Sequence, residues 1–240
     1  MKMNKFSFVA TAIFASSVLF SHIINAKEAK KDNIVVIVLD DTGYADLGSY
    51  GSAINTPSID GIASDGVQYS NFHSTPTCSP TRAAILTGRE PHRVGMGLVS
   101  RFDMGERFPA FRGRISDKSA TIAEILSEQN YGTYAIGKWH LIPPSHMKPT
   151  GPFHHWPSGK GFDRFYGFLA GSTDQFKPEL VEDNHFIEKT YSADEVLTTD
   201  LMNNAISMLH NHVSYSPERP FFMYISTPGM HAPHQASQYY

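Results

Sequence analysis

The residues around the single cysteine combine a reactive thiol with groups that bind anions. Residues 78–88 read Cys-Ser-Pro-Thr-Arg-Ala-Ala-Ile-Leu-Thr-Gly, which predicts a loop that runs into a short helix. Ser79 suits the N-cap of this helix, and Gly88 suits the position just past its end. Cys78 would then lie immediately before a helix N-terminus, where free backbone N–H groups favour an anion, and Arg82 adds a positive charge. For the cysteine taken alone, a buried structural thiol is the alternative.

Three further sets of functional groups follow short apolar runs. These are Asp40 and Asp41 after residues 34–39, Lys138 and His140 after residues 133–136, and His231 after residues 221–226. Two adjacent carboxylates are costly unless a cation holds them, so Asp40 and Asp41 predict a metal site of hard oxygen ligands, with an Asp-rich turn as the alternative. The spacing of the lysine and the histidine is uninformative by itself, and only their position after a strand makes them candidates.

An α/β fold could bring these four segments together. The β-branched run Ile34–Leu39 lacks polar alternation, which predicts a strand buried on both faces of a mostly parallel sheet sandwiched by helices. Helices are expected from Pro57 to Gly66, from an N-cap at Ser119 to about Asn130, and after a capping box of Ser192 and Glu195, while Val67–Phe72 is expected to return the chain to the sheet. Ligands bind at the carboxyl edge of such sheets, where the four segments should meet.

Two long segments show no clear periodicity. Residues 89–118 are rich in Gly, Arg and Phe and predict a surface excursion, whose arginines are either solvated loop charges or the lining of a path for an anionic substrate. Residues 142–171 also read as a loop. Their aromatic cluster, Phe162, Phe165, Tyr166 and Phe168, is interpreted as a wall on the substrate side, with His154, His155 and Trp156 as contact candidates.

The motif Cys-x-Pro-Thr-Arg, followed by Thr-Gly, resembles the signature of the sulfatase family. The resemblance implies an alkaline-phosphatase-like α/β fold and a sulfuric ester hydrolase of the arylsulfatase type. It also implies that Cys78 is oxidised after translation to formylglycine by a maturation enzyme. In that family the aldehyde hydrates to a gem-diol, one hydroxyl attacks sulfur, and the other later expels sulfate.

Further site residues follow from the resemblance position by position. Asp40 and Asp41 match the first metal ligands of the family, which hold calcium together with the side chain derived from Cys78. Arg82 matches the arginine that orients this side chain. The pair in Gly-Lys-Trp-His, Lys138 and His140, matches residues that contact sulfate and the formylglycine hydroxyl, and His231 matches the histidine that acts on the leaving-group oxygen.

The resemblance covers residues 27–240 and implies the N-terminal part of a sulfatase catalytic domain. Family members continue with a further metal-ligand pair, another sulfate-binding lysine and a smaller C-terminal subdomain, so we expect a truncated product or a fragment. Two other functions stay open. One is a phosphonate monoester or phosphodiester hydrolase of the same superfamily, and the other is a non-catalytic sulfate-binding remnant.

The first 26 residues predict export. Lys2 and Lys5 precede an apolar run that ends in Ile-Asn-Ala, as in a signal peptide cleaved after Ala26, with an uncleaved anchor as the alternative. We therefore expect a periplasmic or secreted protein without stable membrane insertion. Without this segment, eighteen basic residues stand against twenty-three acidic ones, which argues against a nucleic-acid surface.

Overall fold

The computed structural model describes residues 30–238, and the compact unit of the chain begins at Asn33. The predicted signal peptide lies outside the described residues. Within residues 30–238, no helix combines the length and the apolar character that crossing a membrane requires.

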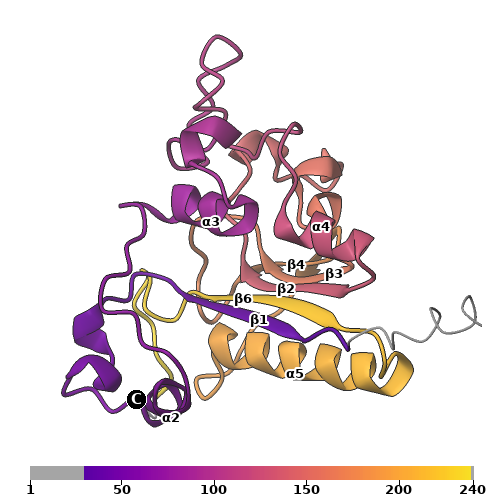
Figure 1. Ribbon diagram of the computed structural model, residues 1–240. Helices are drawn as coiled ribbons and strands as arrows, with labels where there is room; N and C mark the ends of the chain where they lie inside the picture. The colour runs from indigo at the N-terminus through magenta and orange to yellow at the C-terminus, as the bar shows by residue number, and fades with distance from the viewer. Residues whose placement is uncertain (1–29, 239–240) are drawn as a thin grey trace, which may run out of the picture. The chain divides into compact units, whose positions relative to one another are not determined.

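A six-stranded, mostly parallel sheet forms the centre of the unit (Figure 1). Its strands are β1 (Ile34–Leu39), β2 (Gly132–Lys138), β3 (Arg164–Phe168), β4 (Glu179–Glu182), β5 (His185–Glu188) and β6 (Phe221–Thr227). Their spatial order is β1-β6-β2-β3-β4-β5. The first four strands in this order are parallel to one another, whereas β4 pairs antiparallel with β3 and β5 pairs antiparallel with β4. The predicted α/β class with a mostly parallel sheet is confirmed.

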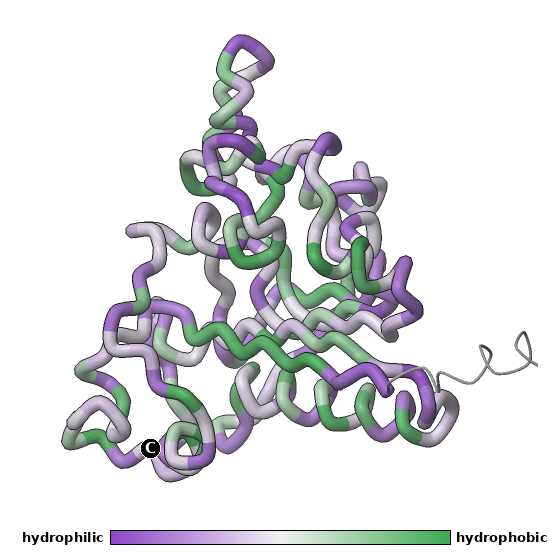
Figure 2. Tube along the Cα trace, viewed as in Figure 1, coloured by the Kyte–Doolittle hydropathy of each residue, from purple (hydrophilic) through white to green (hydrophobic). Residues whose placement is uncertain are grey.

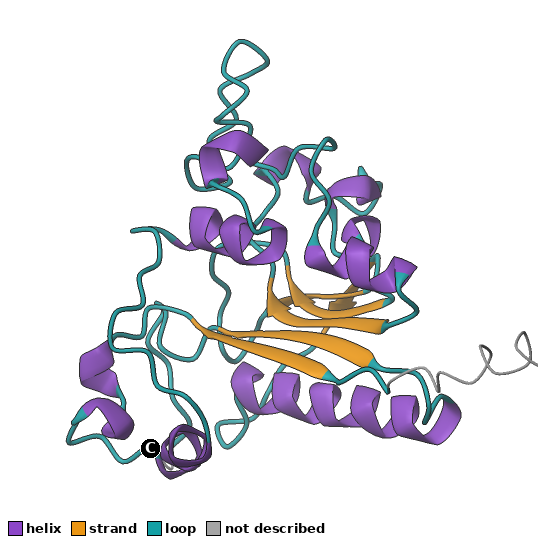
Figure 3. Cartoon of the chain, viewed as in Figure 1, coloured by secondary structure: helices purple, strands orange, loops and turns teal. Residues whose placement is uncertain are grey.

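Helices cover both faces of this sheet (Figure 3). The helices are α2 (Pro57–Asp65), α3 (Cys78–Thr87), α4 (Ile122–Glu128) and α5 (Leu197–Tyr215). Short 3₁₀ turns are η1 (Tyr44–Asp46), η2 (Gly48–Tyr50), η3 (Pro91–Val94), η4 (Pro144–His146), η5 (Phe153–His155) and η6 (Ser158–Lys160). Helices α3 and α4 lie on one face and α5 on the other, so the core has two halves.

Alternate residues of β6 serve these two halves. Phe222 and Tyr224 join the half that contains residues of α3 and α4, whereas Met223 and Ile225 join the half that contains residues of α5. Because successive side chains of a strand point to opposite faces, one apolar run fills both halves. This explains why the run 221–226 carries no polar alternation.

Strand β1 is as hydrophobic as expected (Figure 2), yet it is not buried on both faces. It forms the edge of the sheet and pairs with β6 alone among the described strands. Val35 and Ile37 are 49% and 55% exposed, whereas Val36 and Val38 pack against the core half that includes α3. The prediction of burial on both faces is therefore wrong for this strand, because helix α5 contacts β2, β3 and β6.

Helix starts differ from the predicted caps. Thr77 rather than Ser79 is the N-cap of α3, which makes Cys78 the first residue of the helix. Helix α4 begins after Thr121, whose side chain accepts a hydrogen bond from the Glu124 backbone in a capping box, instead of after Ser119. In both cases a competing Ser or Thr a few residues away is an equally good cap by type, so local sequence could not decide.

Two other local predictions are also wrong. The Ser192 and Glu195 pair forms a turn before α5, which begins at Leu197. Residues 67–72 are not a strand in the described chain, and Val67 and Phe72 remain 81% and 64% exposed. Without a neighbouring strand to pair with, the apolar residues of this segment stay outside the sheet.

The two segments without periodicity contribute to the core. In the first, Val94, Met96 and Ile115 are buried, so residues 89–118 are not a purely surface excursion. The second contains β3, and its aromatic residues are buried in the two halves of the core: Phe162, Phe165, Tyr166 and Phe168. The interpretation of this cluster as a substrate-side wall is wrong, because its side chains fill the layers between sheet and helices.

Candidate anion-binding site

A cavity of about 340 Å³ lies at the carboxyl end of β1, beside the N-terminus of α3. Its lining includes Asp40, Asp41, Cys78 and Arg82. Strand pairing explains how residues far apart in sequence come close here. Leu39 of β1 pairs with Thr227 of β6, and Gly137 of β2 pairs with Ser226 beside it, so Asp40 and Lys138 flank the end of the central strand.

Cys78 contacts His140, which follows strand β2. Its Sγ lies 3.1 Å from Nδ1 of His140. His140 has a φ of 52°, in the left-handed region that non-glycine residues rarely adopt, which turns its ring away from the line of β2. A Cβ added at Gly171 would come within 2.7 Å of this ring, so the absence of a side chain there makes room for it. Burial, together with the charges of Lys138 and Arg82, lowers the pKa of His140 to about 3, which keeps the imidazole neutral.

Arg82 is buried and ties α3 to two strands. Its NH1 donates to the Lys138 backbone oxygen at 3.0 Å and to the Tyr224 hydroxyl at 3.3 Å, and it also contacts the Ser226 hydroxyl. Only 1% of the residue is exposed. Its Nε and NH2 groups have no hydrogen-bond partner among the described residues, and these unused donors belong to a side chain that lines the cavity.

Asp40 is the anionic centre of a buried ion network. Its Oδ2 lies 2.5 Å from Lys138 Nζ and 3.4 Å from Arg82 NH2. Burial alone would raise the pKa of Asp40, but the Arg82 charge and the Lys138 hydrogen bond outweigh this and hold the pKa below its ordinary value. Two buried cations therefore face one buried carboxylate, so the network carries one net positive charge.

Asp41 has a very different environment from its neighbour. Its side chain is 62% exposed, and its Oδ2 lies 3.8 Å from Nε2 of His231 in the segment after β6. The hydroxyl Oγ1 of Thr42 is buried and has no hydrogen-bond partner among residues 30–238. Carboxylate and hydroxyl oxygens on one cavity wall fit a hard cation such as calcium by donor type.

Among the residues singled out from the sequence, Asp40, Asp41, Cys78 and Arg82 line the cavity. Cys78 contacts His140, Arg82 and Lys138 share Asp40, and Asp41 approaches His231. In the described chain, the one group of three His, Cys, Asp or Glu residues with ligand atoms near enough for a shared ion is elsewhere, at Asp117, His154 and His155. The metal role of Asp40, Asp41 and Cys78 stays a prediction.

Sequence reasoning missed two anchoring residues, Tyr224 and Ser226. Both are fully buried polar residues of β6 that contact the guanidinium of Arg82. The available signal was the presence of two hydroxyl groups in an otherwise apolar strand, because buried hydroxyls need hydrogen-bond partners.

The fold and the cavity together define an α/β protein with a thiol-containing pocket, lined by two carboxylates and an arginine, at the carboxyl edge of its parallel strands. Comparison with known proteins identifies the family. The family model described as sulfatase matches residues 32–240, and the chain belongs to the sulfatase family.

Individual relatives agree with this assignment. The chain is 40% identical to human steryl-sulfatase over 152 residues, which cover 62% of this chain and 26% of that protein. It is 26% identical to arylsulfatase of Klebsiella aerogenes over 243 residues, or 98% of this chain and 49% of that one. The crystal structure of Ps i-CgsB in complex with k-i-k-neocarrahexaose is similar with a TM-score of 0.70 and 31% identity, covering 86% of this chain and 47% of the other. The chain therefore spans between about a quarter and a half of the length of these proteins.

Proposed function

We propose that this protein takes part in the hydrolysis of sulfate esters, with the side chain at position 78 as the nucleophile after conversion to formylglycine. The observation that carries the proposal is that Cys78 and Arg82 line one cavity, where Cys78 contacts His140 and Arg82 contacts Lys138. A sulfate ester is an anion, and the net positive charge of the buried network suits it. Nε and NH2 of Arg82, which donate no hydrogen bond among the described residues, suit its oxygen atoms.

The roles of the individual residues follow from their contacts. Arg82 holds the first turn of α3 against β2 and β6, so it would orient the nucleophile at position 78. Lys138, fixed by Asp40, would supply positive charge for a sulfate oxygen. His140 is neutral and 3.1 Å from the position-78 side chain, so its Nδ1 could accept or donate a proton there.

His231 is the candidate for the leaving-group side of the reaction. Its imidazole is only partly exposed, and its Nε2 approaches Asp41 Oδ2 at 3.8 Å. A protonated imidazole could donate to the departing oxygen as a general acid. Asp40, Asp41 and the side chain at position 78 would hold a calcium ion, which would neutralise charge and polarise sulfate oxygens when bound.

Three classes of sulfate ester follow from the printed names of similar proteins. They are aryl sulfates, steryl sulfates and sulfate esters of oligosaccharides of the neocarrahexaose kind, since the relatives include an arylsulfatase, a steryl-sulfatase and a protein crystallised with a neocarrahexaose. We further propose that the protein is exported and that a formylglycine-generating enzyme is its maturation partner, because the motif Cys-x-Pro-x-Arg is intact at residues 78–82.

The test is to produce the chain together with a formylglycine-generating enzyme and to measure both maturation and turnover. Mass spectrometry of the tryptic peptide that contains Cys78 should reveal the aldehyde. Hydrolysis of the three ester classes should depend on calcium and should disappear in Cys78→Ala. Ser74→Ala, at another lining residue of the cavity, is the matched control and should keep most of the rate. An unmodified thiol, or equal rates in wild type and Cys78→Ala, would refute the proposal.

A further inference from the structure

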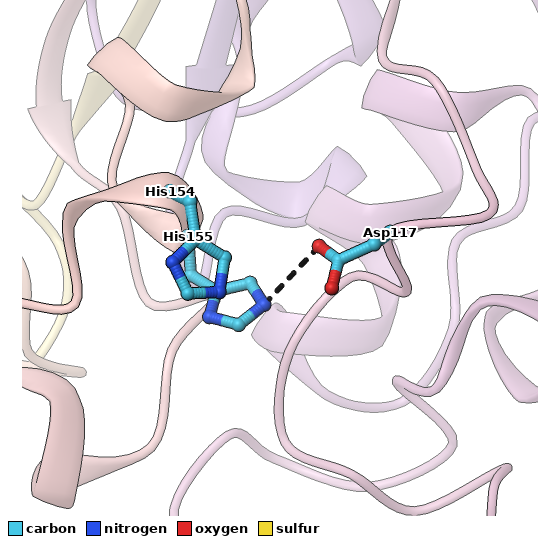
Figure 4. Close-up of side chains that lie close together, drawn as sticks. All are labelled: Asp117, His154 and His155. Atoms are coloured by element: carbon cyan, nitrogen blue, oxygen red, sulfur yellow. Dashed lines mark ion pairs between the residues drawn. The ribbon is translucent and has the colours of Figure 1, made fainter.

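A second group of ligand-type side chains lies away from the cavity (Figure 4). Asp117 comes from the segment before α4, and His154 and His155 come from η5 in the connection between β2 and β3. One donor atom from each residue lies within 4.8 Å of the other two. Sulfate-ester chemistry, as proposed above, uses none of these residues.

His155 points to a ligand for this group. It is only 4% exposed, and neither ring nitrogen has a hydrogen-bond partner among the described residues. Buried polar atoms normally find partners, so two unpaired nitrogens on one buried ring require an explanation. Its Nε2 lies 3.3 Å from Asp117 Oδ1 without hydrogen-bond geometry. A water or a metal ion between them would satisfy both groups.

The distances suit a metal ion of the zinc type. In a tetrahedral site with metal–ligand bonds of about 2.0–2.1 Å, neighbouring ligand atoms are about 3.4 Å apart. The 3.3 Å separation between His155 Nε2 and Asp117 Oδ1 already equals one such edge. The remaining separations, up to 4.8 Å, need only a rotation of the exposed side chains of Asp117 and His154.

The surroundings hold the buried histidine in place. Its ring stacks against His146, with 5.2 Å between centroids, and the tilted ring of His154 lies 3.9 Å away. The Trp139 indole donates to the His155 backbone oxygen at 3.1 Å. The neighbouring turn η6 is tied to the start of α4, because the Thr121 hydroxyl donates to the Lys160 backbone oxygen at 2.7 Å.

One group opposes a cation here. Lys160 Nζ is buried and lies 3.3 Å from the same Asp117 Oδ1 that a metal would use. The ammonium group and the metal ion would compete for this carboxylate, so removal of the ammonium should strengthen metal binding. A variant without this ammonium group, Lys160→Met, should therefore bind the metal ion more tightly than wild type.

We propose that Asp117, His154 and His155 form a binding site for a divalent transition metal ion, Zn²⁺ by ligand type, that joins the segment before α4 to η5. Three protein ligands leave the fourth position to water. The proposal does not rest on the proposed sulfatase activity.

The experiment is a titration of the chain with Co²⁺, followed by visible absorption, and with Zn²⁺ against a chromogenic chelator. Calcium is kept in excess, and Cys78→Ser is the background, so that neither the carboxylates nor the thiol of the cavity compete. We expect one equivalent of bound ion and a thermal midpoint raised by several degrees. His154→Ala and Asp117→Asn, both exposed, should weaken binding at least tenfold, and Lys160→Met should tighten it.

His210→Ala, which removes an exposed histidine from helix α5, is the matched control and should bind like the background protein. Absence of saturable binding would overturn the proposal. So would an affinity that is unchanged in both Asp117→Asn and His154→Ala, or a loss of the same size in His210→Ala. Because the readouts are absorption, chelator competition and thermal unfolding, the result is independent of enzymatic turnover.

Discussion

Asp40 and Asp41 are adjacent carboxylates whose removal should have very different effects on stability. Asp40 is buried 2.5 Å from Lys138 Nζ and 3.4 Å from Arg82 NH2, whereas the Asp41 side chain is 62% exposed. At an effective dielectric constant of about 20, these two N–O separations correspond to gross attractions of about 7 and 5 kcal/mol. Desolvation offsets most of this energy in the intact network.

Asp40→Asn should lower the free energy of unfolding by about 3–5 kcal/mol, because it leaves two buried cations without a counter-charge. Asp41→Asn should change it by less than about 1 kcal/mol, since that carboxylate faces solvent. The assay is urea unfolding at pH 7 with a calcium chelator present. Adding Lys138→Met to Asp40→Asn should recover part of the loss, with a coupling of about 1–3 kcal/mol.

Acid pH gives an independent check of the same reasoning. The folded-state pKa of Asp40 is lower than its ordinary value of 3.8, so its stabilisation is complete above that value and disappears as the pH falls through the lower folded pKa. Asp40→Asn should lack this acid-dependent loss. Equal destabilisation by Asp40→Asn and Asp41→Asn, or no coupling with Lys138→Met, would refute the buried network as the source of stability.

Further predictions concern Arg82, His140 and His231. Arg82→Lys should destabilise the fold by about 2–3 kcal/mol in urea unfolding, because an ammonium cannot reproduce the guanidinium bonds to Lys138 and Tyr224. For His140, whose pKa is lowered to about 3, stabilisation is complete above the ordinary value of 6.5 and declines below it. Wild type should therefore lose more stability than His140→Gln between pH 7 and pH 5, and parallel profiles would contradict this. His231→Ala in matured enzyme should slow aryl sulfates with poor leaving groups most, and a uniform loss across a leaving-group series would exclude the general-acid role.

Sequence alone determined three of the six strands, β1, β2 and β6, and the functional groups that follow them. The apolar runs at residues 34–39 and 221–226 became β1 and β6, and residues 133–136 became the middle of β2, because short, mostly apolar runs between polar loops favour buried strands. The motif at residues 78–82 was sufficient for the family, which the family model confirms. These features depend on local residue types, so they can be read without knowing how the chain folds back.

Tertiary structure decided which strand ends become neighbours. Insertion of β6, from the end of the chain, between β1 and β2 brings Asp40 to Lys138 and places the hydroxyls of β6 under Arg82. Tertiary structure also made β1 an edge strand, so Val35 and Ile37 are exposed. It buried the His155 ring beside Asp117, where neither ring nitrogen makes a hydrogen bond with the described residues. Strand order, edge exposure and the meeting of distant side chains are set by long-range pairing and packing, and local residue types do not encode which distant partner a strand will find.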